Sequence, residues 1–374
     1  MQADVIVIGA GTVGAAIGYG LASRGQRVIV LDGGDRDIRA ANANFGLVWL
    51  HGKGMDMPAY YFLTRKSVDD WQAFDEELTD ATSVDLQYEH RGGLVLCLGE
   101  DDFAQRRDNL LRLHNQLEDA TDPDWEMLDR DALRKLLPRV SLGEEVSGAS
   151  LGKRDGHANP LRLLASLHAG IVQKGGSLHR GCSVRAVQGH SGGGFSVDFG
   201  SGRASAARIV IAAGMGSKAI ARQVGLDVPI RPQRGQILVT EKVMPILPLP
   251  TLDVRQTREG SVMIGATHEE VGLDCSTTAE AAAALSANAV RQFPALAEVS
   301  VVRQWAGLRI LTPDGFPVYA ESESHPGAFV ALCHSGVTLA AFHAGLLAES
   351  IAAGRLPASL NVFHHRRFDV PQAA

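Results

Sequence analysis

The first 32 residues of the chain constrain its fold more than any other segment. They contain an apolar run, a glycine turn, a stretch of small residues, a second apolar run and an acid: Val5–Ile8, Gly9, Gly11, Gly14, Gly14–Ser23, Val28–Leu31 and Asp32. This order predicts strand, turn, helix and strand, which is the βαβ unit that binds a dinucleotide. The alternative interpretation is a glycine-rich turn in an unrelated α/β protein.

Each residue of this turn has a distinct expected role. Gly9 permits the tight turn, Gly11 lets the backbone approach a pyrophosphate, and Gly14 lets the helix lie close to the strand. The phosphates would lie at the helix N-terminus, where free N–H groups and the helix dipole favour negative charge. Asp32 is placed to accept hydrogen bonds from a ribose hydroxyl.

Composition narrows the class of protein. The chain has 374 residues, which is more than one core usually serves, so we expect two domains. A net charge of −6 argues against nucleic acid as a partner and offers no basic membrane patch. The four cysteines show neither zinc-ligand spacing nor a CxxC pair, so we expect free thiols and no metal: Cys97, Cys182, Cys275 and Cys333.

The uncharged run of residues 5–23 resembles a signal or a membrane span only superficially. Asp4 precedes it, there is no basic region before it, and its glycines would make a poor spanning helix. A buried parallel strand followed by a helix explains the same residues. We therefore expect no export, no membrane span and a cytoplasmic location.

The order of the remaining elements predicts a discontinuous arrangement. Strand and helix patterns at residues 85–145 and 229–313 indicate excursions into a second domain with a mixed antiparallel sheet. Residues 1–84, 146–228 and 314–374 would form the dinucleotide-binding domain. Asn159 and Pro160 predict a helix start, as N-cap and first-turn residue respectively. The expected fold class is α/β, α+β overall.

Several separated motifs resemble one family, the D-amino-acid oxidase/glycine oxidase group of flavoproteins, which includes sarcosine oxidases and opine or hydroxyproline dehydrogenases. The motifs occur in the family's order over nearly the whole chain: Gly9–Gly14 with Asp32, 212–214, 232–236, 264–267, Gly307–Arg309 with Thr312–Gly315, and His334–Leu339. The family usually has Glu where this chain has Asp32. The resemblance implies a Rossmann-like FAD-binding domain and a substrate-binding domain.

The resemblance also implies where FAD would lie. The pyrophosphate would lie on the glycine turn, the adenosine ribose on Asp32, the flavin ring beside residues 42–46, and the pyrimidine edge of the ring at the last helix. The implied cofactor-binding residues are Gly9, Gly11, Thr12, Val13, Gly14, Asp32, Asn42, Asn44, Phe45, Gly46, Val184, Ala213, Gly214, Gly307, Arg309, His334, Gly336, Val337 and Thr338. Some relatives attach flavin to a cysteine before the segment matching residues 312–315. This chain has none there, so we expect non-covalent FAD.

Arg309 is the first candidate for binding substrate. A guanidinium in an apolar strand is costly unless it is paired, and an amino-acid carboxylate would pair it with two parallel hydrogen bonds. The matching arginine of glycine oxidases has this role. A structural arginine on the solvent face of the strand is the alternative.

Other candidates concern the proton and the size of the substrate. His51, and after it His268 and His334, are candidates to take the ammonium proton, although each can equally be a histidine satisfied by its surroundings. Where glycine oxidases present aromatic or histidine side chains, this chain has the polar residues Asp253, Arg255 and Gln256. Arg255 or Lys53 could receive a second carboxylate, and Arg255 could equally be a surface charge.

The sequence therefore predicts a flavin amino-acid oxidase that acts on an N-substituted glycine or another secondary amino acid. Hydride would pass to flavin N5, water would hydrolyse the imine, and dioxygen would reoxidise the flavin. The alternative is the catalytic subunit of an opine, sarcosine or D-hydroxyproline dehydrogenase that passes electrons to a partner or a quinone. A homo-oligomer or a partner subunit is compatible with either. A non-catalytic flavin module and an NAD-dependent dehydrogenase are further classes, disfavoured by the acidic charge and the distal 336–339 motif.

Overall fold

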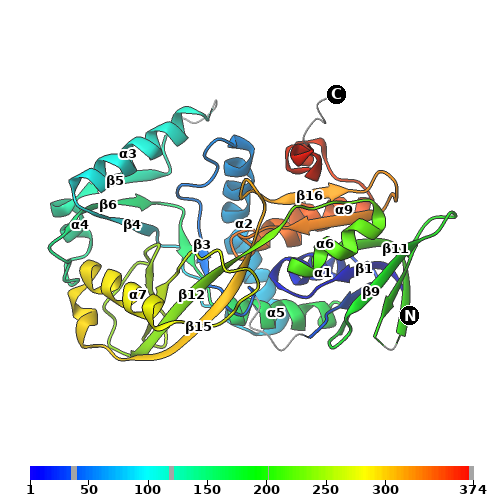
Figure 1. The fold of residues 1–374 in the computed structure, drawn as a ribbon, viewed down its shortest axis with the longest axis horizontal. Coiled ribbons are helices and arrows are strands. Elements are labelled where there is room, and N and C mark those ends of the chain that lie inside the picture. The colour runs from blue at the N-terminus through cyan, green and yellow to red at the C-terminus, as the bar shows by residue number, and fades with distance from the viewer. Residues whose placement is uncertain (35–39, 118–121, 201, 370–374) are drawn as a thin grey trace.

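The computed structural model describes residues 1–34, 40–117, 122–200 and 202–369. Two parts lie side by side, and the long strands β12 (Arg231–Lys242) and β15 (Val301–Leu311) run from one to the other (Figure 1). None of the helices in these residues is long and apolar enough to cross a membrane.

An eight-stranded sheet forms the centre of the first part, with the strand order β16-β17-β11-β1-β2-β8 and with β10 and β9 paired beside β11. The strands β17, β11, β1, β2 and β8 are parallel, and β16 and β10 are antiparallel to their neighbours. The bounds are β1 Gln2–Ile8, β2 Val28–Leu31, β8 Ser177–His179, β9 Val184–Gly189, β10 Phe195–Phe199, β11 Gly202–Ile211, β16 Val318–Glu321 and β17 Ala328–Leu332. The central strands are apolar because both faces of the sheet are covered.

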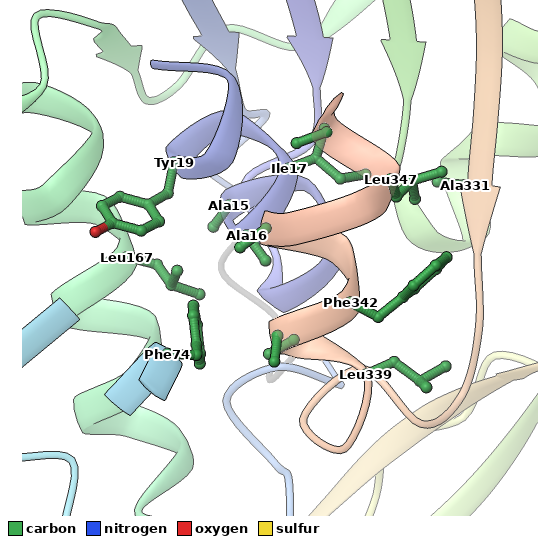
Figure 2. Close-up of a cluster of buried hydrophobic side chains, with 14 of the residues drawn as sticks. Ala15, Ala16, Ile17, Tyr19, Phe74, Leu167, Ala331, Leu339, Phe342 and Leu347 are labelled. Carbon is green, nitrogen blue, oxygen red and sulfur yellow. The ribbon is translucent and has the colours of Figure 1, made fainter. Parts of the chain in front are cut away.

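Helices cover one face of this sheet: α1 (Thr12–Ser23), α2 (Pro58–Thr82), α5 (Pro160–Gln173), α8 (Ala340–Phe342) and α9 (Ala348–Ala353). Their buried side chains form one core, with α1 packed between the other helices and the sheet (Figure 2). The other face packs against β9, β10 and α6 (Ser217–Ala221). The predicted start of α5 is confirmed, since the side chain of Asn159 accepts from the N–H groups of Leu161 and Arg162.

The second part contains two antiparallel sheets, ordered β4-β6-β5 and β13-β14-β12-β15. The remaining elements here are β4 Gly93–Leu98, α3 Glu100–Asn115, β5 Trp125–Asp129, α4 Arg130–Leu136, β6 Val146–Gly152, β13 Val254–Gln256, β14 Ser261–Gly265 and α7 Ala279–Gln292. Strand β6 is the middle strand of the first of these sheets, and the expected domain boundaries stay a prediction. The predicted fold class is confirmed.

Two short strands that are distant in the chain pair with each other. They are β3 (Leu47–Val48) and β7 (Gly156–His157), and α2 and the sheet β4-β6-β5 lie between them in the sequence. The last helical segment begins at Ala340 and contains a π-helical turn at His343–Leu347. Residues 336–339 form a turn before it, in which Val337 and Thr338 line a cavity described below.

Candidate active site

At two of the three glycines that follow β1, a close backbone contact leaves no room for a side chain. Gly9 has φ +105°, and a Cβ there would lie 2.4 Å from the carbonyl oxygen of Ala212. A Cβ on Gly14 would lie 2.0 Å from the carbonyl oxygen of Gly9. At Gly11 the nearest atom to a built Cβ is the Cβ of Ala41, at 3.9 Å. With respect to the residues that the structure describes, Gly11 therefore faces open space.

This open space is a cavity of about 440 Å³ at the N-terminus of α1. No side chain caps this helix end. The Asp32 carboxylate accepts hydrogen bonds from the N–H groups of Ala10 and Gly34, both at 2.8 Å, which fixes its orientation at the cavity wall. The predicted residues lining this cavity are Gly9, Gly11, Thr12, Val13, Asp32, Asn44, Val184, Ala213, Gly214, His334 and Gly336.

A second cavity, of about 360 Å³, continues from the first. The two share the lining residues Ala40, Asn44, Leu308, Ile310, Cys333 and His334, so together they form an elongated channel. The predicted residues lining the second cavity are Asn44, Phe45, Lys53, Asp253, Gly307, Arg309, His334, Val337 and Thr338. Its floor is the sheet that contains β12, β14 and β15.

Arg309 lies across the backbone of β12 on this floor. Its Nη1 donates to the carbonyl oxygen of Thr267 at 2.8 Å, and a Cβ on Gly235 would lie 2.6 Å from the same nitrogen. Burial lowers the pKa of the guanidinium. No carboxylate of the described residues forms an ion pair with Arg309, and its Nε and Nη2 bond to none of them. These two nitrogens remain available to a ligand, although Arg309 remains protonated.

Lys53 lies in the wall of the same cavity. Its Nζ donates to the Oγ of Ser335 at 3.3 Å, and the hydroxyl of Tyr60 donates to the same Oγ at 2.9 Å. Burial lowers the pKa of the ammonium group. The neighbouring turn is held by the indole of Trp71, which donates to the carbonyl oxygens of Val337 and Thr338 at 3.1 Å.

The three candidate histidines occupy different places. His268 and His334 line the cavity, and burial lowers the pKa of each. The side chain of His334 is nevertheless exposed to the channel. His51 is not among the residues that line this cavity, and its Nδ1 lies 3.4 Å from the Oδ2 of buried Asp155. This geometry separates His51 from the place where substrate would lie, so its role as proton acceptor stays a prediction without a contact to support it.

Five other predicted residues lie outside the cavity linings, one of them Gly14, whose close backbone contact is described above. Arg255 is 3% exposed, so it is no surface charge; its Nε donates to the carbonyl oxygen of Phe45 from behind the wall. Gln256 accepts from the N–H of Ile246 and donates to the carbonyl oxygen of Gly260, so it fixes a loop. Asn42 is exposed and Gly46 is packed against the carbonyl oxygen of Ala158. Asp253 does line the cavity, and its carboxylate accepts from Gln292 at 3.1 Å.

Two residues that shape the second cavity were not predicted from the sequence. Gly235 leaves room for the guanidinium, and Trp305 donates through Nε1 to the carbonyl oxygen of Ala43 at 3.4 Å. Strand alternation puts Trp305, Gly307 and Arg309 on one face, so Trp305 could have been found by its spacing. Gly235 could not, because it depends on the register that pairs it with Gly307.

These features fit an extended dinucleotide. The helix end offers unsatisfied N–H groups, Gly11 leaves room for phosphate, and the channel then passes to a cavity with an arginine. Such a site defines a dinucleotide-dependent oxidoreductase. The chain belongs to the DAO family of FAD-dependent oxidoreductases, whose family model matches residues 4–350.

Individual proteins with similar sequences or structures are consistent with membership of this family. One of the subunits of opine oxidase from Agrobacterium tumefaciens is 40% identical over 373 residues, which cover 100% of this chain and 99% of the relative. Glycine oxidase of Pseudomonas putida is 28% identical over 339 residues, 89% of this chain and 90% of the relative. Among solved structures, glycine oxidase from Geobacillus kaustophilus superposes with a TM-score of 0.88 over 98% of this chain and 99% of that one, at 24% identity.

Proposed function

We propose that this chain oxidises the C–N bond of a secondary, N-substituted amino acid and that Arg309 binds the substrate carboxylate. The observation that carries the proposal is the guanidinium of Arg309, which lies in a cavity continuous with the dinucleotide channel and has two nitrogens without a partner among the described residues. A carboxylate accepts two parallel hydrogen bonds from such a group. The carboxylate would then fix the direction of the substrate's Cα–H bond.

FAD supplies the redox chemistry when bound, because it accepts the two electrons and the hydrogen that leave the substrate. The residues that line the first cavity would hold its phosphates and ribose, and Val337 and Thr338 would lie near the ring. We propose that binding is non-covalent. Cys333 lines both cavities, but burial raises the pKa of its thiol to about 12, and a protonated thiol is a poor nucleophile.

The proposed substrate class follows from the relative with 40% identity, whose name specifies an opine oxidase. That relative is one part of a multi-subunit enzyme by name, which favours the second candidate function, in which this chain is the catalytic subunit of a complex. Cys97, Cys182 and Cys333 are free thiols, which agrees with the proposed cytoplasmic location.

The acceptor can be assigned by measuring hydrogen peroxide. An oxidase releases peroxide in step with substrate consumption when the isolated chain is supplied with air. A catalytic subunit of a dehydrogenase reduces its flavin with substrate, yet it releases little peroxide until a partner or an artificial acceptor is added. Rapid peroxide release by the isolated chain would show that dioxygen is the acceptor and that no partner subunit is required to accept electrons.

Anaerobic bleaching of the bound flavin tests the proposed reaction. We expect N-substituted amino acids to bleach the protein, and Arg309→Met to lower kcat/KM by about 100-fold, because charge-assisted hydrogen bonds are lost. Arg303→Met is the matched control, since Arg303 is an exposed residue of the same strand. The proposal fails if no amino acid reduces the flavin, or if Arg309→Met and Arg303→Met behave alike.

A further inference from the structure

The second cavity of the channel has two cationic side chains in its lining, and the acid whose charge acts on Lys53, Asp155, lies outside the lining. Lys53 and Arg309 both line it, and neither forms an ion pair with an acid in the part of the chain that the structure describes. Asp253 is the single acid among the lining residues, and its carboxylate accepts from Gln292 on α7. Unpaired cations in a partly buried site are costly, so this cavity favours an anionic ligand.

Lys53 is held on a fixed segment. The Oδ1 of Asp155, a fully buried residue, accepts from the N–H groups of Leu50 at 2.7 Å and His51 at 3.1 Å. The N–H of Lys53 donates to the carbonyl oxygen of Leu50 at 2.9 Å and closes the turn. The backbone of Lys53 is therefore fixed by hydrogen bonds, and the bond from Nζ to Ser335 directs the ammonium group into the cavity wall.

The contacts of Lys53 also leave it capacity for a ligand. Ser335 provides its one hydrogen bond among the described residues, and an ammonium group has three donors. The Oγ of Ser335 accepts from Tyr60 as well, so its own proton is free to be donated. Lys53 and Ser335 thus offer several donors to one anion. Arg255, the other cation considered for such a role, lies behind Phe45 and outside the cavity lining.

We propose that Lys53 and Ser335 form a second carboxylate subsite in addition to the Arg309 anchor. The preferred ligands carry a carboxylate on each side of the secondary amine, and Lys53 distinguishes them from ligands with one carboxylate. This inference rests on the proposed function for the identity of the reacting bond. The subsite itself is defined by charge and can be tested with ligands that do not react.

Glutarate and butyrate are suitable probes, because they differ chiefly in that glutarate carries a second carboxylate. Titrating each into the flavin-containing protein and following the flavin absorbance gives two dissociation constants. We expect the native protein to prefer glutarate by about 10- to 100-fold, the range for one charge-assisted contact. Lys53→Met should abolish the preference, Lys53→Arg should restore most of it, and Arg309→Met should weaken both ligands.

Lys66→Met provides the control for removing a lysine charge, since Lys66 is exposed on α2 and pairs with Asp70. It should bind both ligands as the native protein does. Equal affinity of the native protein for the two acids, or a preference retained in Lys53→Met, would overturn the subsite. A different result would overturn the proposed reaction and leave the subsite standing: no amino acid bleaches the flavin, yet the protein still prefers glutarate.

Discussion

The dinucleotide cradle and the substrate cavity are built in different ways. The phosphate end of the cradle is formed largely by one stretch, in which Gly9, Gly11 and Gly14 shape the backbone and Asp32 follows on the next strand, although Val184 and Ala213 complete the lining. The cavity depends on side chains from distant segments, such as Lys53 and Arg309. The cradle therefore binds through main-chain groups and local geometry, whereas the cavity binds through charges that only the tertiary fold brings together.

This difference separates binding of the cofactor from choice of substrate. A change in the cradle should affect folding or FAD affinity before it affects specificity. A change in the cavity should alter the choice of substrate in a protein that still folds and still binds FAD. Four substitutions test this division, in order of decreasing expected effect.

Gly14→Val should have the largest effect. Its Cβ would lie 2.0 Å from the carbonyl oxygen of Gly9, which is backbone and cannot move without opening the contact between α1 and β1. We expect a loss of more than about 3 kcal/mol in the free energy of unfolding and little folded protein. Thermal unfolding and the yield of monodisperse protein measure this. A variant as stable as the native protein would show that the close approach is not needed.

Gly11→Val is the matched variant in the same turn. Gly11 has φ −67° and ψ 177°, which any residue adopts, and a Cβ there meets no atom closer than 3.9 Å. We expect the apoprotein to unfold at nearly the native temperature, while FAD affinity falls by about 10- to 100-fold, because the phosphates lose backbone hydrogen bonds. Fluorescence titration of apoprotein with FAD measures the affinity. Unchanged affinity would mean that the pyrophosphate lies elsewhere.

Gly235→Ala should affect the cavity alone. The added Cβ would lie 2.6 Å from Nη1 of Arg309, and the guanidinium can shift away because it is the end of a flexible side chain. We expect KM for an amino acid to rise about 10-fold through misplacement of the anchor, with FAD affinity and unfolding temperature nearly unchanged. Steady-state kinetics beside an FAD titration separates the two effects. A fall in FAD affinity with KM intact would contradict the division.

Glu269→Gln should have the smallest effect, a decrease in the unfolding temperature that depends on pH. Glu269 belongs to the segment of residues 266–278, which reaches both cavities, and its hydrogen bond from buried Arg234 lowers its pKa to about 2. The unfolded carboxyl has its ordinary pKa of 4.5. The ion pair therefore stabilises the fold fully above pH 4.5, and this contribution is lost as the pH falls towards 2.

The expected measurement is a difference in unfolding temperature between native protein and Glu269→Gln. At pH 7 the variant should unfold about 1–4 °C lower, the range for a partly exposed ion pair, and the difference should shrink below about pH 4. Glu270→Gln serves as the control, because Glu270 pairs with Arg231 in an exposed position. A difference that stays constant down to about pH 3 would exclude this role for the Glu269 carboxylate.

The sequence pointed to the turn at the N-terminus of α1 and to some of the residues that line the two cavities. Local rules place glycines and an acid around one turn, so Gly9, Gly11, Gly14 and Asp32 were identifiable, as was the start of α5 at Asn159. Arg309 was identifiable because a charge in an apolar strand requires a partner. Local rules do not predict which residues of different helices and strands come into contact.

The side chains around residue 255 illustrate this limit. Arg255 and Asp253 are two positions apart in the chain, and both were expected at the substrate. The structure brings Asp253 to the cavity and directs Arg255 to the carbonyl oxygen of Phe45, a contact across 210 residues. His51, the first candidate for taking the proton, lies against Asp155 and outside the cavity lining, and its role stays a prediction. Each outcome depends on long-range packing that has no local signature.

The ribbon of β12 and β15 has a consequence for how ligands enter. The two strands pair from Arg231 and Leu311 to Thr240 and Val301, and Ile310, the residue next to the Arg309 anchor, packs against the core of the first part. A hinge between the parts would have to bend this ribbon and would pull the anchor away from the channel. Separating the two parts to admit a ligand would therefore displace the Arg309 anchor itself.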